Sequence, residues 1–449
     1  MTNAKTIAHA LLSNEVLKGS AAALAIKFTG SLLGFAMFAL AARAMEPHAF
    51  GTLAVIFNLM SFLAVIAACG QETLIVRSWD EYGGSDRPAL ARGALTFGVM
   101  LTVGAGLAVV ATVAIAWPIV QPGISVALIF AACLFLLMQA FMNFSAQFSR
   151  VAAGVIVGET PREIIWRLFV VLIILAHQLL QTTFTATEFF VSAASAIALS
   201  ILLQQLLVAR TLPRSVFAAA SEYDVAEWTP RSFRMWLSAI LETSSQYLEV
   251  IAIGLFLGPT VAAFYFIATR ITNVFAMISG SITAYATSQI SNLFHRNAKD
   301  ELQTILRSAA IISATLAAGA FGVIAFGGKL LLWIFGSVYI DAYPALLVLA
   351  AGASISALAG PASYLLLLTG NEGVYPRIVA CGLLGRLALI AVLGPWLGLM
   401  GAAVAWSAST IAVAVALVLA CRQRTGVDPS LLGVILRPRV TPVLKGELP

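Results

Sequence analysis

The sequence predicts an all-α integral membrane protein with about twelve transmembrane helices. Of its 449 residues, 60% are hydrophobic and only 10% are charged, whereas soluble domains average roughly 45–50% apolar and about 25% charged residues. Mean hydropathy is +0.96. The apolar residues form blocks of about 20, the length at which a helix crosses a hydrocarbon core about 30 Å thick. These observations exclude a soluble globular enzyme.

Twelve apolar blocks follow one another along the chain, and no stretch between them is long enough for a soluble domain. Each is predicted to be one membrane-spanning helix. The blocks are centred on residues 20–42, 49–70, 92–116, 123–147, 162–180, 187–209, 233–257, 260–290, 308–327, 342–369, 376–396 and 398–421.

The blocks divide into two predicted six-helix bundles, residues 20–210 and 233–421, joined by a linker at 211–232. Residues 1–19 are too polar for a signal peptide, and their spaced Ile and Leu residues predict an amphipathic lead-in on the membrane surface. Residues 422–449 form a tail whose apolar run is too short to span.

The lysines and arginines predict the orientation, because basic residues in short loops stay on the cytoplasmic side. With the N-terminus inside, all but five of the 26 Lys and Arg fall in cytoplasmic segments, including Arg150, Arg162 and Arg167. Of the remaining five, Arg43 and Lys329 fall in outer loops, and Lys27, Arg270 and Arg386 lie within spans. Both termini are therefore expected to be cytoplasmic. The net charge of +6 reflects this topology, and no basic soluble module suggests nucleic-acid binding.

The four cysteines and four histidines show no chemical grouping. The cysteines lie in or beside apolar blocks without CxxC spacing, so neither a disulfide framework nor a zinc site is indicated. The histidines are scattered, with no paired base or nucleophile. We expect no metal, cofactor or catalytic residue.

Two halves with six spans each must be related by an axis along the membrane normal, as in transporters built from parallel repeats. A faint internal match agrees with this pseudo-two-fold relation. Pro47 opens the second span shortly before Phe50, and Pro259 opens the eighth shortly before Phe264. Proline suits the first turn of a helix, where its missing N–H would be unpaired anyway.

Several short motifs carry a resemblance to a known family. They are Ala42-Arg43 through Phe50-Gly51, GQETLIVR from Gly70 to Arg77, Ala268-Thr269-Arg270-Ile271, Ile334-Phe335-Gly336 followed by Tyr339, and LGLMGAA from Leu397 to Ala403. In order and topology they resemble the polysaccharide-exporter branch of the multidrug/oligosaccharidyl-lipid/polysaccharide flippase superfamily, which includes O-antigen and exopolysaccharide flippases. The resemblance covers roughly residues 20–421.

The resemblance implies two bundles around a central cavity that opens alternately to each side of a bacterial inner membrane. It implies an alternating-access flippase that carries a polyprenyl-pyrophosphate-linked glycan from the cytoplasmic to the outer leaflet. The bilayer and other membrane proteins of polysaccharide assembly would be its partners, and lipopolysaccharide or exopolysaccharide assembly its pathway.

Charged residues inside the spans are the principal functional candidates, since each costs about 2.5–3.5 kcal/mol at mid-bilayer. In span seven, Glu242 and Glu249 share a helical face, with Gln246 beside it. Arg270 in span eight lies at a depth between these two carboxylates, and Asn273 continues its face. The two helices can therefore be joined by ion pairs, or Arg270 can serve the substrate.

Arg270, Lys27 and Arg386 are candidates for a cationic lining that binds pyrophosphate, because arginine grips phosphate oxygens in a bidentate manner. The resemblance adds Arg43 and favours Arg270, since both lie in its motifs. Lys27 and Arg386 rest on depth alone and can instead snorkel or pair. Glu242 and Glu249 are also candidates for coupling to a proton or sodium gradient.

Uncharged polar residues and helix breakers complete the candidates. Gln139, Asn143 and Gln147 form a stripe on span four that can meet glycan hydroxyls or hold helices together. Gly360-Pro361 interrupts span ten and is a candidate hinge. Gly104 and Gly106 can loosen span three.

Three other functions fit the sequence less well than a flippase does. A multidrug or small-cation antiporter of the same superfamily would favour an acidic cavity, and the buried charges favour this less. A glycan polymerase or acyltransferase needs catalytic residues on a substantial loop, and the outer loops are short. A non-transporting scaffold leaves the buried charges unexplained.

Overall fold

The computed structural model describes residues 14–83, 87–121, 123–211, 219–296, 299–369, 373–431 and 433. Within these ranges the chain is helical and has no strand. Most of the predicted lead-in and most of the predicted tail lie outside the described residues. The chain divides into two compact units, residues 1–263 and 264–449, which are described separately below.

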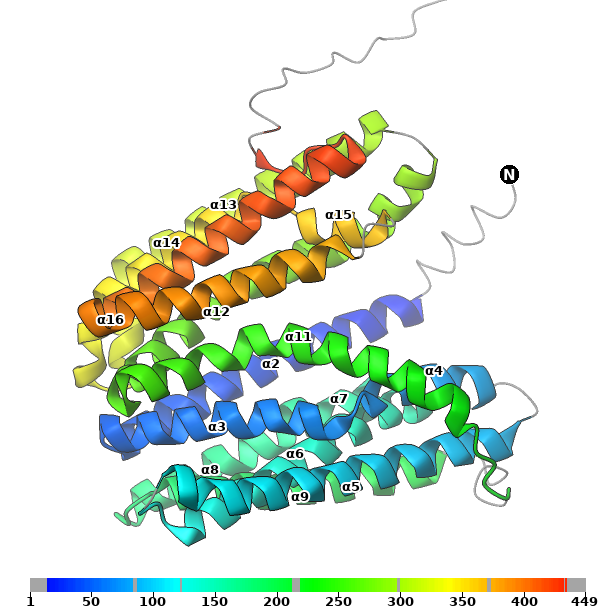
Figure 1. The fold of residues 1–449 in the computed structure, drawn as a ribbon, viewed down its shortest axis with the longest axis vertical. Helices are drawn as coiled ribbons and strands as arrows, with labels where there is room; N and C mark the ends of the chain where they lie inside the picture. The colour runs from blue at the N-terminus through cyan, green and yellow to red at the C-terminus, as the bar shows by residue number, and fades with distance from the viewer. Residues whose placement is uncertain are drawn as a thin grey trace, which may run out of the picture. The chain divides into compact units, whose positions relative to one another are not determined.

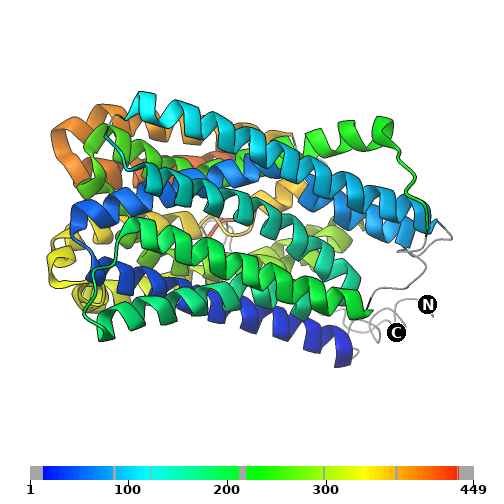
Figure 2. The ribbon, with the colours of Figure 1, turned by 90° about the horizontal axis from the view of Figure 1, so that it is seen from below.

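The first unit holds the helices that Figure 1 colours from blue to green. The bounds are α2 Asn14–Ala44, α3 Pro47–Ala68, α4 Gln71–Gly83, α5 Pro88–Val120, α6 Val126–Ala153, α7 Val155–Thr160, the π-helix η1 Pro161–Ile165, α8 Trp166–Leu179, α9 Ala186–Thr211 and α11 Val225–Leu257. Figure 2 shows these helices running roughly side by side, as expected for a membrane bundle.

The second unit contains most of α12 Pro259–His295, followed by α13 Lys299–Trp333, the 3₁₀ helix η2 Ser337–Ala342, α14 Tyr343–Ala357, α15 Ala362–Leu368 and α16 Val374–Thr425. Its helices run from green to red in Figure 1. A cluster of Ile, Leu and Val side chains from α12, α13, α15 and α16 forms its core at one end.

The structure confirms the prediction of twelve spanning helices. Ten helices of the described chain are long and apolar enough to cross a membrane. One of these, α16, is two helices, because Gly398 has φ 56° and ψ −130° and breaks it. The remaining span is the consecutive run of α7, η1 and α8, which a π-turn divides.

Helix α11 packs against α3 and α4 within the first unit. Between α3 and α4, Cys69 and Gly70 adopt left-handed conformations and end α3. Trp236 of α11 donates its indole N–H to the Ile66 carbonyl there, at 2.9 Å. A Cβ on Gly70 would lie 2.4 Å from the backbone oxygen of Ser232. The break in the second span is therefore a place where α11 approaches closely.

The first compact unit and the predicted first six-helix bundle end at different residues. The first unit extends through α11 to residue 263, whereas the predicted first bundle ends at residue 210. Part of the predicted linker is helical, since α11 begins at Val225 and includes Pro230. The division into two six-helix bundles remains a prediction.

Span ten breaks at Gly360, which has φ +63°, and Pro361 starts the second segment. The residues after α16 fold back onto this break. The Leu431 N–H donates to the Leu358 carbonyl at 2.9 Å, and a Cβ on Gly360 would lie 2.3 Å from the Pro429 carbonyl oxygen. The hinge role of Gly360 and Pro361 remains a prediction, but their backbone is held by the C-terminal segment.

Asp428 anchors that segment. Its carboxylate pairs with Arg422 at 2.5 Å. The side-chain amide of Gln303 in α13 donates to the Asp428 carbonyl at 2.7 Å and accepts from the Asp428 N–H at 3.3 Å. Burial would raise the pKa of Asp428, but hydrogen bonds from Ser430 and the Arg422 guanidinium outweigh it and hold this pKa below its ordinary value. The carboxylate is therefore charged at neutral pH.

We expect Asp428→Asn to loosen the C-terminal segment, seen as faster amide hydrogen exchange at Leu431, by about 10-fold for the loss of roughly 1.4 kcal/mol. The exposed Glu301→Gln is the control. Because the folded pKa is lowered, the protection should be complete above the unfolded pKa of about 3.9 and lost as the pH falls through the folded value. Loss of protection between pH 7 and 5 would contradict this.

Candidate functional site

A π-turn in the fifth span is the centre of the polar interior of the first unit. Pro161 opens η1 and has no N–H, so the regular hydrogen bond to the Val157 carbonyl is missing. Gln204 of α9 replaces it, donating its side-chain amide to the carbonyls of Val157 at 3.2 Å and Gly158 at 2.9 Å. Gln204 is fully buried. The π-turn is therefore held by a neighbouring helix.

Charged side chains surround this turn. Arg167 pairs with Glu163 at 2.5 Å, and its guanidinium also donates to the backbone carbonyls of Glu163 at 2.6 Å and Gly30 at 3.4 Å. A Cβ on Gly30 would lie 2.9 Å from the Arg167 guanidinium, so glycine makes room for it. Lys27 and Arg162 interact electrostatically with the same carboxylate.

Two further carboxylates extend the group. Glu159, one turn before Glu163, is 5% exposed and lies 3.9 Å from Arg150 of α6. Glu72 of α4 interacts with Arg162. The charge network therefore contains four cations and three anions, drawn from five helical segments and η1: Lys27, Glu72, Arg150, Glu159, Arg162, Glu163 and Arg167.

Helix positions place part of this network within the membrane. Arg167 is about 18 Å from the C-terminal end of α8 at Leu179, and Lys27 is about 26 Å from the C-terminal end of α2 at Ala44, at 1.5 Å per residue. The hydrocarbon core is about 30 Å thick. Charges at such depths are retained only with partners or water and commonly mark transport pathways.

The polar stripe of α6 leads into the network. Gln139 donates to Asn143 at 3.4 Å, and Asn143 is buried. Gln147 follows on the same face, and its buried amide oxygen has no hydrogen-bond partner in the structure. Arg150 is the next residue of this face. Only the structure shows that the stripe ends at the charges around the π-turn.

Three predicted residues of α11 lie elsewhere in the first unit. Glu249 is buried, at 5% exposure, whereas Glu242 and Gln246 are exposed. Arg43 is exposed in the last turn of α2, where a cation interacts favourably with the helix dipole. These residues are outside the charge network as defined above.

The predicted residues of the second unit have separate surroundings. The Arg270 guanidinium carbon lies 4.4 Å from the centre of the Phe266 ring. Asn273, one turn further, is exposed. Arg386 has its own partners on the last helix, a hydrogen bond to Thr410 at 3.1 Å and the ring of Trp406. The functional roles of these residues remain predictions.

Most of the charge network could not be predicted from the sequence. Span five was expected to begin at residue 162, whereas helical structure continues upstream of it, because Gly154 alone separates α6 from α7. The cytoplasmic placement of Arg162 and Arg167 remains a prediction. A usable signal was the spacing between Gly154 and Pro161, which leaves six residues that form α7 rather than a loop. Among the described residues, no three His, Cys, Asp or Glu form a metal site.

We expect the partly buried pair Glu163–Arg167 to show strong energetic coupling. Each residue is replaced by Gln, singly and together, and the free energy of unfolding is measured in mixed micelles. The double-mutant cycle should give a coupling free energy of about 1–3 kcal/mol. Glu227–Arg231 is a matched control, with the same residues and i,i+4 spacing but greater exposure. Its coupling should stay below about 1 kcal/mol. Equal coupling of the two pairs would contradict a buried network.

Solved structures of membrane transporters share this fold. An inward-facing multidrug resistance MATE family transporter of the MOP superfamily matches with a TM-score of 0.73, 14% identity and coverage of 90% of this chain and 98% of the other. The lipid II flippase MurJ, in an inward closed conformation, matches with a TM-score of 0.66, 13% identity and coverage of 88% and 86%. An outward-facing multidrug resistance MATE family transporter matches with a TM-score of 0.63, 17% identity and coverage of 92% of this chain and 95% of the other.

No curated protein matches the sequence. The sequence model of a family described as polysaccharide biosynthesis protein matches residues 16–289, more than half of the chain. That range includes the whole charge network and the motif around Arg270. The chain therefore belongs to the polysaccharide biosynthesis protein family, on the multi-pass helical membrane fold of the MOP superfamily transporters.

Proposed function

We propose that the protein is an alternating-access flippase that moves a polyprenyl-pyrophosphate-linked oligosaccharide from the cytoplasmic to the outer leaflet of a bacterial inner membrane. The observation that carries this proposal is the set of basic side chains within the spans: Lys27 and Arg167 in the first unit, Arg270 and Arg386 in the second. Guanidinium groups bind phosphate oxygens in a bidentate geometry that ammonium groups do not provide.

Family and fold support a transporter rather than an enzyme. The family is one of polysaccharide biosynthesis, and the fold is shared with a lipid II flippase. A glycan substrate attached to a lipid unites these two observations. We further propose that the product serves O-antigen, lipopolysaccharide or exopolysaccharide assembly, together with other membrane proteins of that pathway.

A multidrug or small-cation antiporter is the second candidate, favoured by the similarity to MATE transporters. An organic cation requires uncompensated carboxylates in its site. The charge network instead holds four cations to three anions, and this favours an anionic substrate. The two candidates differ in what accumulates when the protein is absent.

Deletion of the gene should cause lipid-linked glycan repeats to accumulate on the inner leaflet, with loss of surface polysaccharide. The measurement is mass spectrometry of extracted lipid-linked glycans, with their leaflet reported by an impermeant sugar-oxidising reagent. Normal surface polysaccharide without accumulation would overturn the proposal. Increased sensitivity to cationic drugs alone would support the antiporter instead.

Complementation by variants tests the role of Arg270 in the same assay. Arg270→Ala should reduce glycan export at least 10-fold, and Arg270→Lys should restore only part of it, because lysine keeps the charge without the bidentate geometry. The exposed Arg377→Ala is the control and should export normally. Normal export by both Arg270 variants, once their membrane insertion is verified, would exclude a substrate role for Arg270.

We also propose that transport is coupled to a proton or sodium gradient through Glu249, whose carboxyl is buried, rather than through the exposed Glu242. Glu249→Gln should abolish gradient-driven transport in reconstituted vesicles, with a change of at least 10-fold, while downhill exchange continues. Glu242→Gln is the control. Equal gradient dependence in wild type and Glu249→Gln would refute the coupling role.

A further inference from the structure

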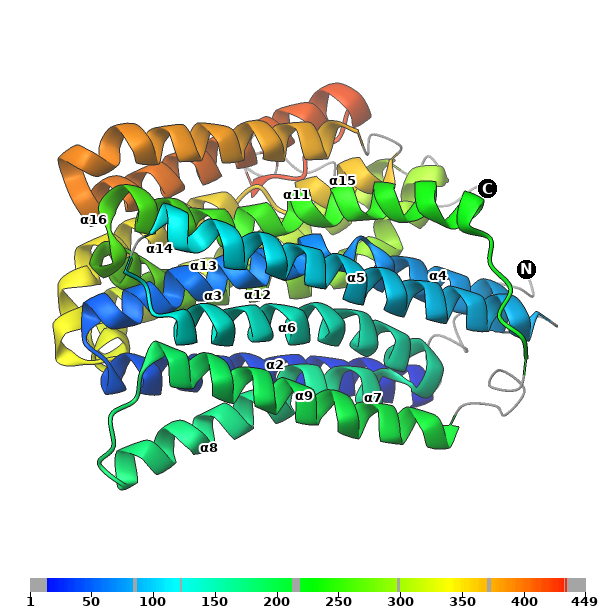
Figure 3. The ribbon, with the colours of Figure 1, turned by 60° about the horizontal axis from the view of Figure 1, so that its bottom comes forward.

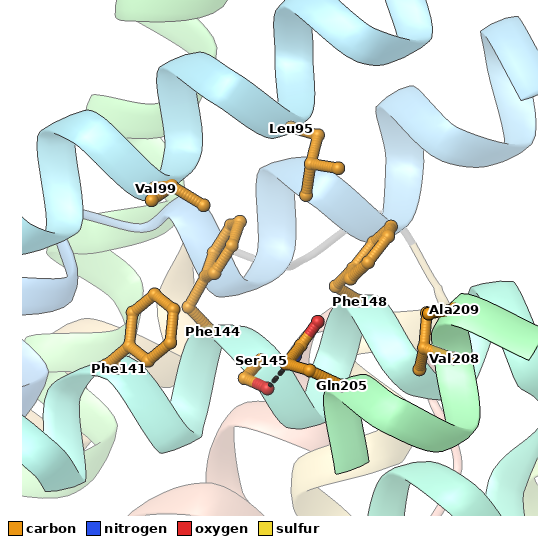
Figure 4. Close-up of a pocket in the computed structure, with 9 residues that line it drawn as sticks. All are labelled: Leu95, Val99, Phe141, Phe144, Ser145, Phe148, Gln205, Val208 and Ala209. Carbon is orange, nitrogen blue, oxygen red and sulfur yellow. Dashed lines mark hydrogen bonds between the residues drawn. The ribbon is translucent and has the colours of Figure 1, made fainter. Parts of the chain in front are cut away.

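An apolar groove runs along the cytoplasmic half of the first unit. It has a volume of about 280 Å³ and is lined by α5, α6 and α9. Helix α6 packs against both other helices, and Figure 3 shows it lying between them. Three phenylalanines, Phe141, Phe144 and Phe148, supply most of the floor, with Leu95 and Val99 opposite (Figure 4). The walls suit a hydrocarbon chain.

Neighbouring side chains show that the groove adjoins hydrocarbon. Met100 of α5 is 66% exposed, and Leu202 and Leu206 of α9 are 57% and 55% exposed. Apart from Arg92, the residues of α5 carry no charge. A surface with this composition is stable against lipid tails rather than water.

The groove lies at the inner boundary of the hydrocarbon core. At 1.5 Å per residue, α6 with 28 residues is about 42 Å long and exceeds the core by about 12 Å. Twenty residues, enough to cross the core, run from Val126 to Ser145 in α6 and from Ala186 to Gln205 in α9. Ser145 and Gln205, both in the groove, therefore mark the level at which the core ends.

These two polar residues form a small hydrogen-bonding group within the apolar walls. Gln205 donates its side-chain N–H to the Ser145 hydroxyl at 2.6 Å, and Ser145 donates to the side-chain oxygen of Gln204. Figure 4 shows the Gln205 amide oxygen directed toward Phe148 and the cavity. The second amide N–H of Gln205 can still donate. An ester group at this depth would find both a donor and a polar surface.

Basic residues follow the groove on the cytoplasmic side of all three helices. Arg92 precedes Leu95 by one turn in α5, Arg150 comes two residues after Phe148 in α6, and Arg210 follows Ala209 directly in α9. Beyond the groove toward the cytoplasm, none of these three helices has an acidic residue. The order from core to cytoplasm is therefore apolar wall, amide and hydroxyl, then arginine.

We propose that this groove binds one anionic glycerophospholipid of the cytoplasmic leaflet. Its acyl chain would lie against Phe141 and Phe144, its ester region beside Ser145 and Gln205, and its phosphate near the arginines. Basic pockets between helices on the cytoplasmic side bind anionic headgroups in the same way. The groove wall itself contains no member of the charge network, although Arg150 beside it also pairs with Glu159 there. The proposal does not depend on the proposed transport function.

The bound lipid would be connected to the charge network through one chain of hydrogen bonds. From Gln205 it passes through Ser145 to Gln204, and Gln204 holds the Val157 and Gly158 carbonyls at the start of the π-turn. Occupancy of the groove should therefore stabilise the fifth span, whose π-turn depends on Gln204.

Native mass spectrometry of the full-length protein in detergent tests the site. Palmitoyl-oleoyl phosphatidylglycerol is the probe and the phosphatidylcholine of the same chains is the neutral comparison. Wild type should retain one phosphatidylglycerol at least fivefold more than phosphatidylcholine. Ala209→Trp, at an exposed position of the groove wall, should reduce phosphatidylglycerol retention at least fivefold.

Matched variants separate the groove from general effects. Ala198→Trp, also exposed on α9 but outside the groove, should retain phosphatidylglycerol as wild type does. Arg210→Gln should lower the preference for phosphatidylglycerol over phosphatidylcholine, whereas the exposed Arg234→Gln on α11 should not. Added phosphatidylglycerol should raise the melting temperature of wild type and not of Ala209→Trp.

Three results would overturn the proposal. One is equal retention of the two lipids by wild type. Another is retention of phosphatidylglycerol that Ala198→Trp and Ala209→Trp reduce equally. The third is displacement of phosphatidylglycerol by equimolar undecaprenyl phosphate in wild type but not in Ala209→Trp, which would assign the groove to a polyprenyl tail.

Discussion

Backbone carbonyls released at helix breaks are the constraint on which this structure depends. In a hydrocarbon core no water can pair them, so each must find a donor elsewhere in the protein. Trp236 serves Ile66 after α3, Gln204 serves Val157 and Gly158 before the π-turn, and Leu431 serves Leu358 in span ten. Each break thereby fixes the position of a second segment, so the interrupted helices become the points at which the fold is joined.

The positions of the charges follow from the same constraint. The π-turn turns Glu159 and Glu163 toward α6 and α2, and the small Gly30 and Gly158 allow those helices to approach. A Cβ on Gly158 would lie 2.7 Å from the Ala146 carbonyl oxygen. Close packing then brings Arg150 to Glu159 and Lys27 to Glu163. Buried charges of this kind contribute little net stability, and their retention within a transporter fold is consistent with a role in transport.

The sequence predicted the class of fold well, because a hydrocarbon slab imposes a length on every span that composition reveals directly. Gly360-Pro361 also identified the place where span ten is interrupted. The charge network was harder to predict, because a 20-residue window places the start of span five at residue 162, beyond the short α7 and Pro161. Which charges face one another depends on helix rotation and on close approach at glycines, neither of which hydropathy records.

The C-terminal segment has a consequence for how the protein is made. Span ten leaves the ribosome well before Leu431, and both halves of α16 must be synthesised in between. At roughly 5–20 residues per second, the Leu358 carbonyl waits several seconds for its donor. During that time span ten lies in the translocation machinery or the bilayer without the hydrogen bond that Leu431 later donates to Leu358. The backbone of span ten is therefore fully paired only after the segment that contains Leu431 has been synthesised.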